Sequence, residues 1–241
     1  MASTTRLRRL RTGTVINLTS KKQEEQIGAA LIEVDRRLCE KYPYRFTHEK
    51  RLPLRTAVAH LSESFPEVDF HVHFDTSSIN PDGGFLYLVG TDEQSHLVLV
   101  SEVKNQGTND RRLAEGKSKQ AKGNAIERLG KNVIGLRTAM LTETIFPFVC
   151  FGYGCDFEPD SSILDRVSTI AMFGRLNAIH LHRQGPGGEF DRGSFYFRAK
   201  RWTVEEMADV MFDVANRSVL YYQSKYGEDN FVRRDSTELG D

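Results

Sequence analysis

The stretch that decides the fold reads Pro81-Asp82-Gly83-Gly84-Phe85-Leu86-Tyr87-Leu88-Val89, then a polar connection, then His96-Leu97-Val98-Leu99-Val100-Ser101-Glu102-Val103-Lys104. Two strand-forming runs that flank a short connection with Gly and Asp predict a β-hairpin. If its turn centres near Asp92, antiparallel pairing brings Asp82 level with Glu102. Strand side chains alternate between two faces, so Glu102 and Lys104 project from the same face. The sequence therefore predicts two carboxylates and an ammonium at one end of the hairpin.

The chemistry of these charges suggests a metal site. The second run is apolar on both faces, which predicts a central strand, and charges beside it are costly unless they pair or bind a metal. Mg²⁺ binds scissile phosphates and activates water, and it prefers one or two carboxylates with further oxygens. Asp82, Glu102 and the Val103 carbonyl supply such oxygens, and Lys104 would stabilise the transition state or position the water. The alternative is a structural ion pair at a strand end, and the pattern alone leaves both interpretations open.

The length of the chain predicts a single domain over residues 1–241. The chain is 39% hydrophobic and 27% charged, which is typical of a globular protein, and its zero net charge does not by itself indicate a nucleic-acid partner. The three cysteines have no CxxC spacing, which fits a reducing compartment. No apolar run approaches the length of a membrane span, and the N-terminus lacks the apolar core of a signal peptide. We therefore expect a cytoplasmic protein with no membrane association.

The two ends of the chain differ in charge. Residues 1–20 include the basic run Arg6-Leu7-Arg8-Arg9-Leu10-Arg11, which predicts an arm that is either solvated or in contact with phosphates. Residues 228–241 end in a weakly acidic segment and are expected to form a flexible tail.

Helices and strands are intermixed along the chain, as in an α/β domain. Apolar periodicity predicts helices over residues 23–40, 54–61, 124–140, from 162 onward and 203–222. Alternating or continuous apolar runs predict strands over residues 68–74, 146–153, 177–181 and 195–199. Residues 105–122 predict a long loop or a weakly amphipathic arm, and residues 185–193 a loop. His71 and His73 share one face of their strand, either as metal ligands or as surface histidines.

A second group of functional candidates is the segment Gly123-Asn124-Ala125-Ile126-Glu127-Arg128. Asn124 and Glu127 fit a capping box at the start of a helix, whose free N–H groups suit contact with DNA. Asn binds adenine edges and Arg donates to purine N7, and Asn124 and Arg128 lie about one turn apart. The alternative is an ordinary capped helix with solvated charges, and the pattern does not exclude it.

Together these segments resemble the EcoRI-type restriction endonucleases, a branch of the PD-(D/E)xK nucleases. Residues 77–84, 98–107 and 123–128 occur in the family's order and near its spacing, and weaker similarity extends to residues 163–166 and 211–214. The resemblance implies a restriction-endonuclease-like fold, with a central mixed β-sheet flanked by helices and a catalytic hairpin. It also implies a homodimer that uses Mg²⁺ to cut both strands of palindromic double-stranded DNA, with 5′-phosphate ends, in a restriction-modification system with a cognate methyltransferase.

The resemblance also implies roles for individual residues. Asp82, Glu102 and Lys104 match the catalytic motif, and Asp82, Glu102 and the Val103 carbonyl match its metal ligands. The residues matching DNA-recognition positions are Asn124, Ala125 and Arg128 at a central AATT, Glu127 orienting that Arg, and Gln106 and Arg166 near the bases.

This sequence departs from the EcoRI pattern at three places. Thr169 replaces a second arginine, the segment between Gln106 and Gly123 is shorter, and Lys122 replaces an alanine. A lysine can donate to guanine O6 and N7. The resemblance implies that these changes affect the outer base pair or the clamp around the DNA, and not the AATT core. We therefore expect a hexamer other than GAATTC, with CAATTG as the first candidate. The alternative functions are a structure-selective repair nuclease of the same fold and a non-cleaving DNA-binding protein.

Overall fold

The computed structural model describes residues 15–234 except 72–74, 106, 120–123, 159–160, 162–175, 184, 186–187 and 189–191, and it also leaves the side chains of residues 15–20, 105–108 and 124–128 undescribed. A five-stranded sheet lies at the centre in the order β1 (Phe46–Glu49), β4 (Gly84–Val89), β5 (Ser95–Asn105), β6 (Phe148–Tyr153) and β7 (Ser194–Arg198). β1, β4 and β5 pair antiparallel, whereas β5, β6 and β7 pair parallel. The expected central mixed sheet is therefore confirmed.

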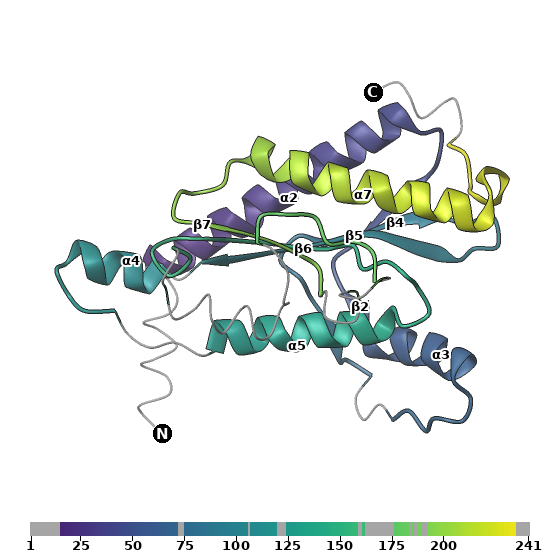
Figure 1. Cartoon of the computed structure of the whole chain (residues 1–241), viewed down its shortest axis with the longest axis horizontal. Helices are drawn as coiled ribbons and strands as arrows, with labels where there is room; N and C mark the ends of the chain where they lie inside the picture. The colour runs from purple at the N-terminus through teal and green to yellow at the C-terminus, as the bar shows by residue number, and fades with distance from the viewer. Residues whose placement is uncertain are drawn as a thin grey trace.

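Helices cover both faces of this sheet, as Figure 1 shows. The larger helices α2 (Val15–Lys41) and α7 (Val204–Tyr226) lie on one face, and α3 (Leu54–Ser64) and α5 (Asn124–Ala139) lie on the other. The remaining elements are the paired short strands β2 (Leu52–Pro53) and β3 (Ser78–Ile79), the helix α4 (Gly107–Ala114) and the 3-10 turn η1 (Glu228–Asn230). No helix in the described part of the chain is long and apolar enough to cross a membrane.

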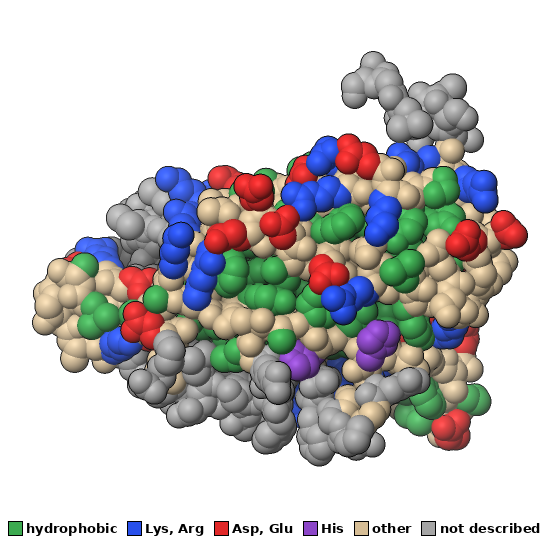
Figure 2. Space-filling model, turned by 45° about the horizontal axis from the view of Figure 1, so that its top comes forward, with side chains coloured by type: hydrophobic (Ala, Val, Ile, Leu, Met, Phe, Trp, Pro, Cys, Tyr) green, Lys and Arg blue, Asp and Glu red, His purple; other side chains and the backbone are tan. Residues whose placement is uncertain are grey.

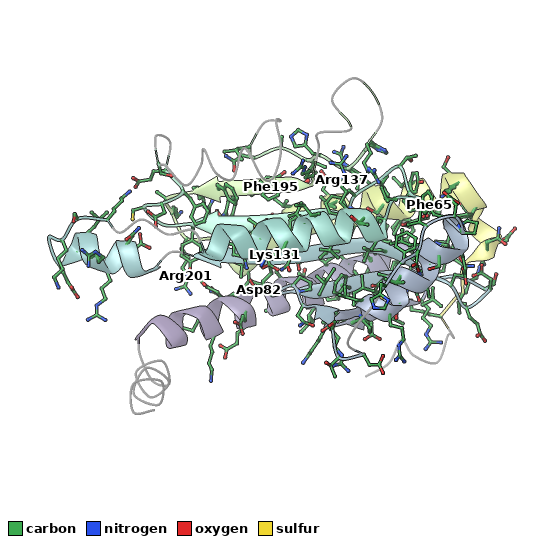
Figure 3. All side chains as sticks on the ribbon, turned by 90° about the horizontal axis from the view of Figure 1, so that it is seen from below. Phe65, Asp82, Lys131, Arg137, Phe195 and Arg201 are labelled. Atoms are coloured by element: carbon green, nitrogen blue, oxygen red, sulfur yellow. The ribbon has the colours of Figure 1, made fainter. Side chains whose placement is uncertain are left out.

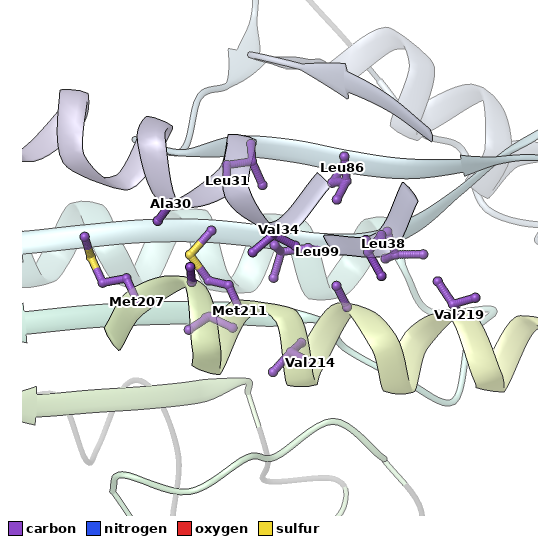
Figure 4. Packing of buried hydrophobic residues seen from close by; sticks show 14 of the residues in the cluster. Ala30, Leu31, Val34, Leu38, Leu86, Leu99, Met207, Met211, Val214 and Val219 are labelled. Carbon is purple, nitrogen blue, oxygen red and sulfur yellow. The ribbon is translucent and has the colours of Figure 1, made fainter. Parts of the chain in front are cut away.

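The α2/α7 face buries the larger core. The periodic apolar residues of α2 meet those of α7 over the sheet (Figure 4). The fully buried residues of this core include Ile27, Val34 and Leu38 of α2, Leu99 of β5, and Met211, Val214 and Val219 of α7. Thr203 and Glu206 form the predicted capping box at the start of α7. This packing confirms the helices predicted over residues 23–40 and 203–222, and both extend beyond those bounds.

The α5 face buries a second core. Leu129 and Val133 of α5 contact a cluster that includes Phe85, Val100 and Cys150 from three neighbouring strands. Strand β5 therefore contributes apolar side chains to both faces, as a central strand must. The central position predicted for the second run of the hairpin is confirmed.

The hairpin register differs by one residue between its two halves. Near the turn, Val89 pairs with Ser95 and Tyr87 with Leu97, as a turn centred on Asp92 predicts. An irregularity between Leu86 and Tyr87 then shifts the pairing, so that Gly84 lies opposite Ser101. An extra residue on one strand is a β-bulge, which bends the strand and redirects its side chains.

Two strand predictions are wrong. Residues 68–71 form no strand, and Val68 is 44% exposed, so its side chain has no core to pack against. Residues 177–181 form no strand either, because Asn177 has a φ of 58° and bonds instead to the backbone of Phe195 and Phe197. Residues 72–74, with His73, lie outside the described residues, and so does the helix predicted from Ser162.

The other loop and terminal predictions are corrected in part. Residues 105–122 contain the helix α4, which is held by buried Asn109 donating to both oxygens of buried Asp156. Residues 15–20 of the predicted N-terminal arm belong to α2, and residues 1–14 lie outside the described part. The prediction of a flexible tail is wrong for residues 228–234, because Phe231 is 2% exposed and forms a bridge with Gly90.

Candidate active site

A tight glycine turn places Asp82 beside β5. The Gly84 N–H donates to the Pro81 carbonyl at 3.1 Å, and Gly84 has a φ of 83°, which favours glycine. A Cβ on Gly83 would lie 2.0 Å from Ser101 Oγ, so only glycine allows the turn to approach β5 this closely. The Gly83 N–H then donates to the Ser101 carbonyl at 2.9 Å. The two glycines thus fix the position of Asp82 relative to Glu102.

The structure brings Asp82, Glu102 and Lys104 into contact. Lys104 Nζ donates to Asp82 Oδ2 at 3.4 Å and forms a shorter contact with Glu102 Oε1. The Asp82 N–H donates to Glu102 Oε2 at 3.1 Å. The ammonium therefore lies between the two carboxylates, and Glu102 and Lys104 share a face as the sequence predicted.

The backbone of Val103 completes the site. Its N–H donates to Asp82 Oδ2 at 3.3 Å, which shows that Val103 faces the strand edge from which the Asp82 turn approaches. In a strand, the N–H and C=O of one residue point to the same edge. The Val103 carbonyl is therefore directed toward the same side as the Asp82 carboxylate.

Burial makes this group of charges unusual. Side-chain exposure is 1% for Glu102, 16% for Lys104 and 26% for Asp82. Burial raises the pKa of Glu102 above its ordinary value, against the opposing effect of Lys104. Burial lowers the pKa of Lys104, but the Glu102 and Asp82 carboxylates outweigh it and leave that pKa above its ordinary value. Lys104 therefore remains a cation at neutral pH.

The donor set suits a hard divalent cation. Two carboxylates and a backbone carbonyl offer only oxygen ligands, as Mg²⁺ prefers, and leave coordination positions for phosphate and water oxygens. No group of three or more His, Cys, Asp or Glu side chains that could hold a metal occurs among the described residues. A cation that shares its coordination with substrate fits this site, whereas a closed structural metal site does not.

The start of α5 lies on the same face of the sheet as the three charged side chains. Glu102 pairs with Cys150, and residues directly opposite in a ladder share a face. Cys150 belongs to the core cluster of α5. Figure 3 looks onto this face, with α5 in front of the sheet and Asp82 beside it. The helix predicted from Asn124 is therefore present, and it lies over the face that carries the site.

The predicted recognition side chains are not all described. The helix backbone includes Asn124, Ala125, Glu127 and Arg128, but their side chains lie outside the described residues, as do Lys122, Gln106 and Arg166. The capping box of Asn124 and Glu127 also stays a prediction.

Sequence patterns did not single out Ser101 or the Val103 N–H. Ser101 is fully buried beneath Gly83, and its hydroxyl has no hydrogen-bond partner among the described residues. The adjacent glycines were the available signal, since paired glycines in a turn often mark a close backbone approach.

Comparisons with known proteins identify the family of this chain. The family described as "Restriction endonuclease EcoRI" matches residues 11–229. The type II restriction enzyme RsrI of Cereibacter sphaeroides is 28% identical over 239 residues, which cover 85% of this chain and 86% of RsrI. The type II restriction enzyme EcoRI of Escherichia coli is 25% identical over 248 residues, which cover 83% of this chain and 85% of that enzyme.

Type II restriction enzymes are site-specific deoxyribonucleases, and they generally need a divalent metal ion. DNA is therefore the substrate that the family implies. The family match spans most of the chain and confirms the resemblance drawn from the hairpin and the 123–128 segment. On these grounds the chain belongs to the EcoRI family of restriction endonucleases.

Proposed function

We propose that the protein is a homodimeric, Mg²⁺-dependent type II restriction endonuclease that cuts both strands of a palindromic duplex site with an AATT core. The observation that carries this proposal is the contact of Asp82, Glu102 and Lys104 with one another on the sheet face that α5 covers. One element supplies the groups for cleavage, and the neighbouring helix supplies the groups for choosing the site.

In this proposal Asp82, Glu102 and the Val103 carbonyl hold the Mg²⁺ ion. The bound ion would polarise the scissile phosphate and lower the pKa of an attacking water. The raised pKa of Glu102 means that its buried carboxylate gains strongly from a facing cation. The Gly83–Gly84 turn keeps Asp82 within reach of Glu102, so that both carboxylates can bind one ion.

Lys104 acts in this proposal as a fixed cation. Its raised pKa keeps it protonated, so it donates hydrogen bonds and does not serve as a general base in the observed arrangement. An ammonium placed there stabilises the negative charge that develops on the phosphate oxygens. Attack by water on phosphorus then breaks the bond to the 3′ oxygen and leaves a 5′-phosphate and a 3′-hydroxyl.

Recognition is assigned to the start of α5 and the segments beside it. Asn124, Ala125 and Arg128 read the AATT core, and Glu127 orients Arg128. Gln106, Lys122 and Arg166 approach the outer bases. The proposed hexamer is CAATTG, with GAATTC as the alternative. The two-fold symmetry of a dimer would match that of the palindrome, and a cognate methyltransferase would protect the same sites of the host in the bacterial cytoplasm.

Digestion of a genomic DNA of known sequence, with the fragment ends sequenced, tests this proposal. The expected result is discrete Mg²⁺-dependent fragments that end within an AATT-containing palindrome and carry 5′-phosphates. Asp82→Asn should abolish cleavage, while binding to the same duplex in Ca²⁺ persists. Random degradation would overturn the specificity, preferential cleavage of branched DNA would indicate a repair nuclease, and binding without cleavage would indicate a DNA-binding protein.

A further inference from the structure

Three exposed basic side chains gather at the edge of the sheet where the parallel strands end. They are Lys22 of α2 and the adjacent pair Lys200 and Arg201, which follow β7. We call Lys22, Lys200 and Arg201 the edge cluster. Figure 2 shows Lys and Arg side chains in a row near the end of the molecule that holds α4.

The contacts of Arg201 place α2 beside the loop that follows β7. Arg201 Nη2 donates to Gln26 Oε1 at 2.9 Å. Lys22 and Gln26 are four residues apart on α2, so their side chains lie on one face, about one turn from each other. Lys22 therefore lies next to Arg201 although 179 positions separate them in the sequence.

The loop that carries Lys200 and Arg201 is held rigidly. Arg198 stacks on Trp202 with its guanidinium carbon 3.6 Å from the ring centroid. It also donates to the carbonyls of Lys200 and Arg201 at 2.8 Å each, and to Glu206. Trp202 Nε1 donates to the Gly152 carbonyl at 3.0 Å. The two basic side chains therefore project from a fixed backbone, and little backbone entropy is lost when they bind a ligand.

The described residues provide no ion-pair partner for the edge cluster. No ion pair of Lys22, Lys200 or Arg201 is present in the described part of the chain, whereas the nearby Glu206 carboxylate is paired with Arg198. Three cations on a firm support form a surface that fits a polyanion.

The edge cluster lies close to the proposed cleavage site. Lys104 pairs with Gly152 on β6, and the next residue, Tyr153, pairs with Arg198 at the end of β7. Neighbouring strands lie about 4.8 Å apart, so the end of β7 is roughly 10 Å from Lys104. A DNA strand has a phosphate about every 3.4 Å along the helix axis. If one phosphate of a duplex contacts Lys104, another phosphate a few nucleotides away can therefore reach the edge cluster.

We propose that Lys22, Lys200 and Arg201 form a phosphate-contact surface for the DNA backbone, separate from the groups that cut and from those that read bases. This inference deepens the proposed function and rests on it, since the duplex held at Asp82 is the one that would reach the cluster. Contacts to phosphates position the protein and strengthen binding, but they do not read sequence.

Salt dependence tests the contact surface directly. The triple variant Lys22→Gln, Lys200→Gln, Arg201→Gln should bind the proposed AATT-containing duplex more weakly in Ca²⁺. The slope of log K against log salt should fall by about 0.9 for each phosphate that the variant no longer neutralises, or roughly 2.7 per subunit for three phosphates. The variant should still cut at the same sequence as the unaltered protein at low salt. An unchanged slope would overturn the inference.

A matched control removes the same charge from the other end of the molecule. Lys41, Arg45 and Arg233 are all exposed. Lys41 ends α2 and lies about 28 Å from Lys22 along that helix, because each helical residue adds ~1.5 Å. The triple variant Lys41→Gln, Arg45→Gln, Arg233→Gln should retain the salt slope of the unaltered protein. An equal loss of slope in both triple variants would indicate an effect of net charge and would also overturn the inference.

Duplexes with single neutral methylphosphonate linkages locate the contacted phosphates. Neutral linkages at the contacted positions should weaken binding of the unaltered protein but not of the Lys22/Lys200/Arg201 variant. Sensitivity that is identical in the two proteins would contradict the assignment. If the unaltered protein cuts no specific site, the proposed function fails, yet the slopes on any duplex still decide whether the cluster contacts phosphates.

Discussion

The two ends of the β4–β5 hairpin are built from different kinds of contact. At the turn end, the His96 ring lies 4.9 Å from the centroids of both Tyr222 and Tyr226 and 5.7 Å from that of Phe231. At the other end, Asp82, Glu102 and Lys104 bring three charges together in a largely buried position. Burial of aromatic rings stabilises a fold by itself, whereas buried charges lower stability unless each has a partner of opposite charge.

The difference indicates that the two ends of one pair of strands have different roles. The turn end anchors the hairpin to α7 and to the last described residues of the chain, while the charged end holds the groups assigned to cleavage. Substitutions at the turn end should therefore change stability and leave activity intact, whereas substitutions at the charged end should lower activity. Four experiments test that separation.

Phe231→Ala should produce the largest loss of stability. Phe231 is 2% exposed and also packs against Tyr44 at 5.5 Å, so its removal leaves a cavity that costs about 3 kcal/mol. Urea unfolding measures the loss, and cleavage per folded molecule should not change. Leu220→Ala is the control: Leu220 is 49% exposed on α7, and its loss should stay within about 0.5 kcal/mol. A Phe231→Ala protein as stable as the control would show that the turn end is no anchor.

Among these four substitutions, Lys104→Ala should produce the largest loss of activity. Without the ammonium between the two carboxylates, developing phosphate charge loses a fixed donor, and kcat should fall about 10²–10³-fold. Single-turnover cleavage of the AATT-containing duplex measures the change, and Ca²⁺-dependent binding should persist. Lys41→Ala, at the exposed end of α2, provides the comparison and should keep full activity. Activity within tenfold of the unaltered protein would exclude the proposed role of Lys104.

How far these two ends could be predicted from the sequence depends on the range of the forces involved. The hairpin and the shared face of Glu102 and Lys104 follow from local alternation and turn chemistry, and both predictions are confirmed. The predicted register holds only from the turn to Tyr87, because the bulge beyond it depends on packing that no local pattern encodes. Asp82 therefore contacts the Val103 backbone as well as Glu102. The position of Asp82 along β5 differs from the predicted one, but Asp82 and Glu102 remain in contact.

The contacts of the turn end were beyond the reach of local patterns. Phe231 belongs to a segment whose composition resembles a tail, and long-range contacts, including those of Phe231 with Tyr44, His96 and Gly90, hold it in place. Asn109 likewise lies in a polar stretch that predicts a loop, and its buried bond to Asp156 accounts for the helix α4 there. Propensity gives way to tertiary contacts where a polar segment finds a buried partner.

Gly84→Ala should lower both stability and activity. A Cβ at this position would lie 2.8 Å from the Glu49 carbonyl oxygen, on a backbone with φ of 83°, and the strain should lower stability by about 1–3 kcal/mol. Relief of that strain moves Asp82, so activity should fall as well. Gly28→Ala in α2 is the matched control, since no atom lies within 4 Å of its added Cβ and helix propensity should add about 0.5–1 kcal/mol. Equal effects of the two substitutions would show that the turn tolerates a side chain.

His96→Phe should produce the smallest effect, and only at acidic pH. Burial lowers the pKa of His96, while Asp92 and Glu143 oppose the shift and Lys225 adds to it. Because the folded pKa lies below the unfolded value of about 6.5, the unfolded chain binds more protons, and stability rises with pH in that range. The contribution of neutral His96 is thus complete above about pH 6.5 and is lost as the pH falls toward the folded pKa.

Phe keeps the ring contacts with Tyr222 and Tyr226 but cannot take up a proton. The difference in unfolding free energy between the two proteins, measured in urea at pH 7.5 and 5.5, should therefore shift in favour of the Phe variant at the lower pH. A difference that stays constant between these pH values would show that the His96 ring is solvated when protonated, and that the turn end is less tightly closed than its aromatic contacts indicate.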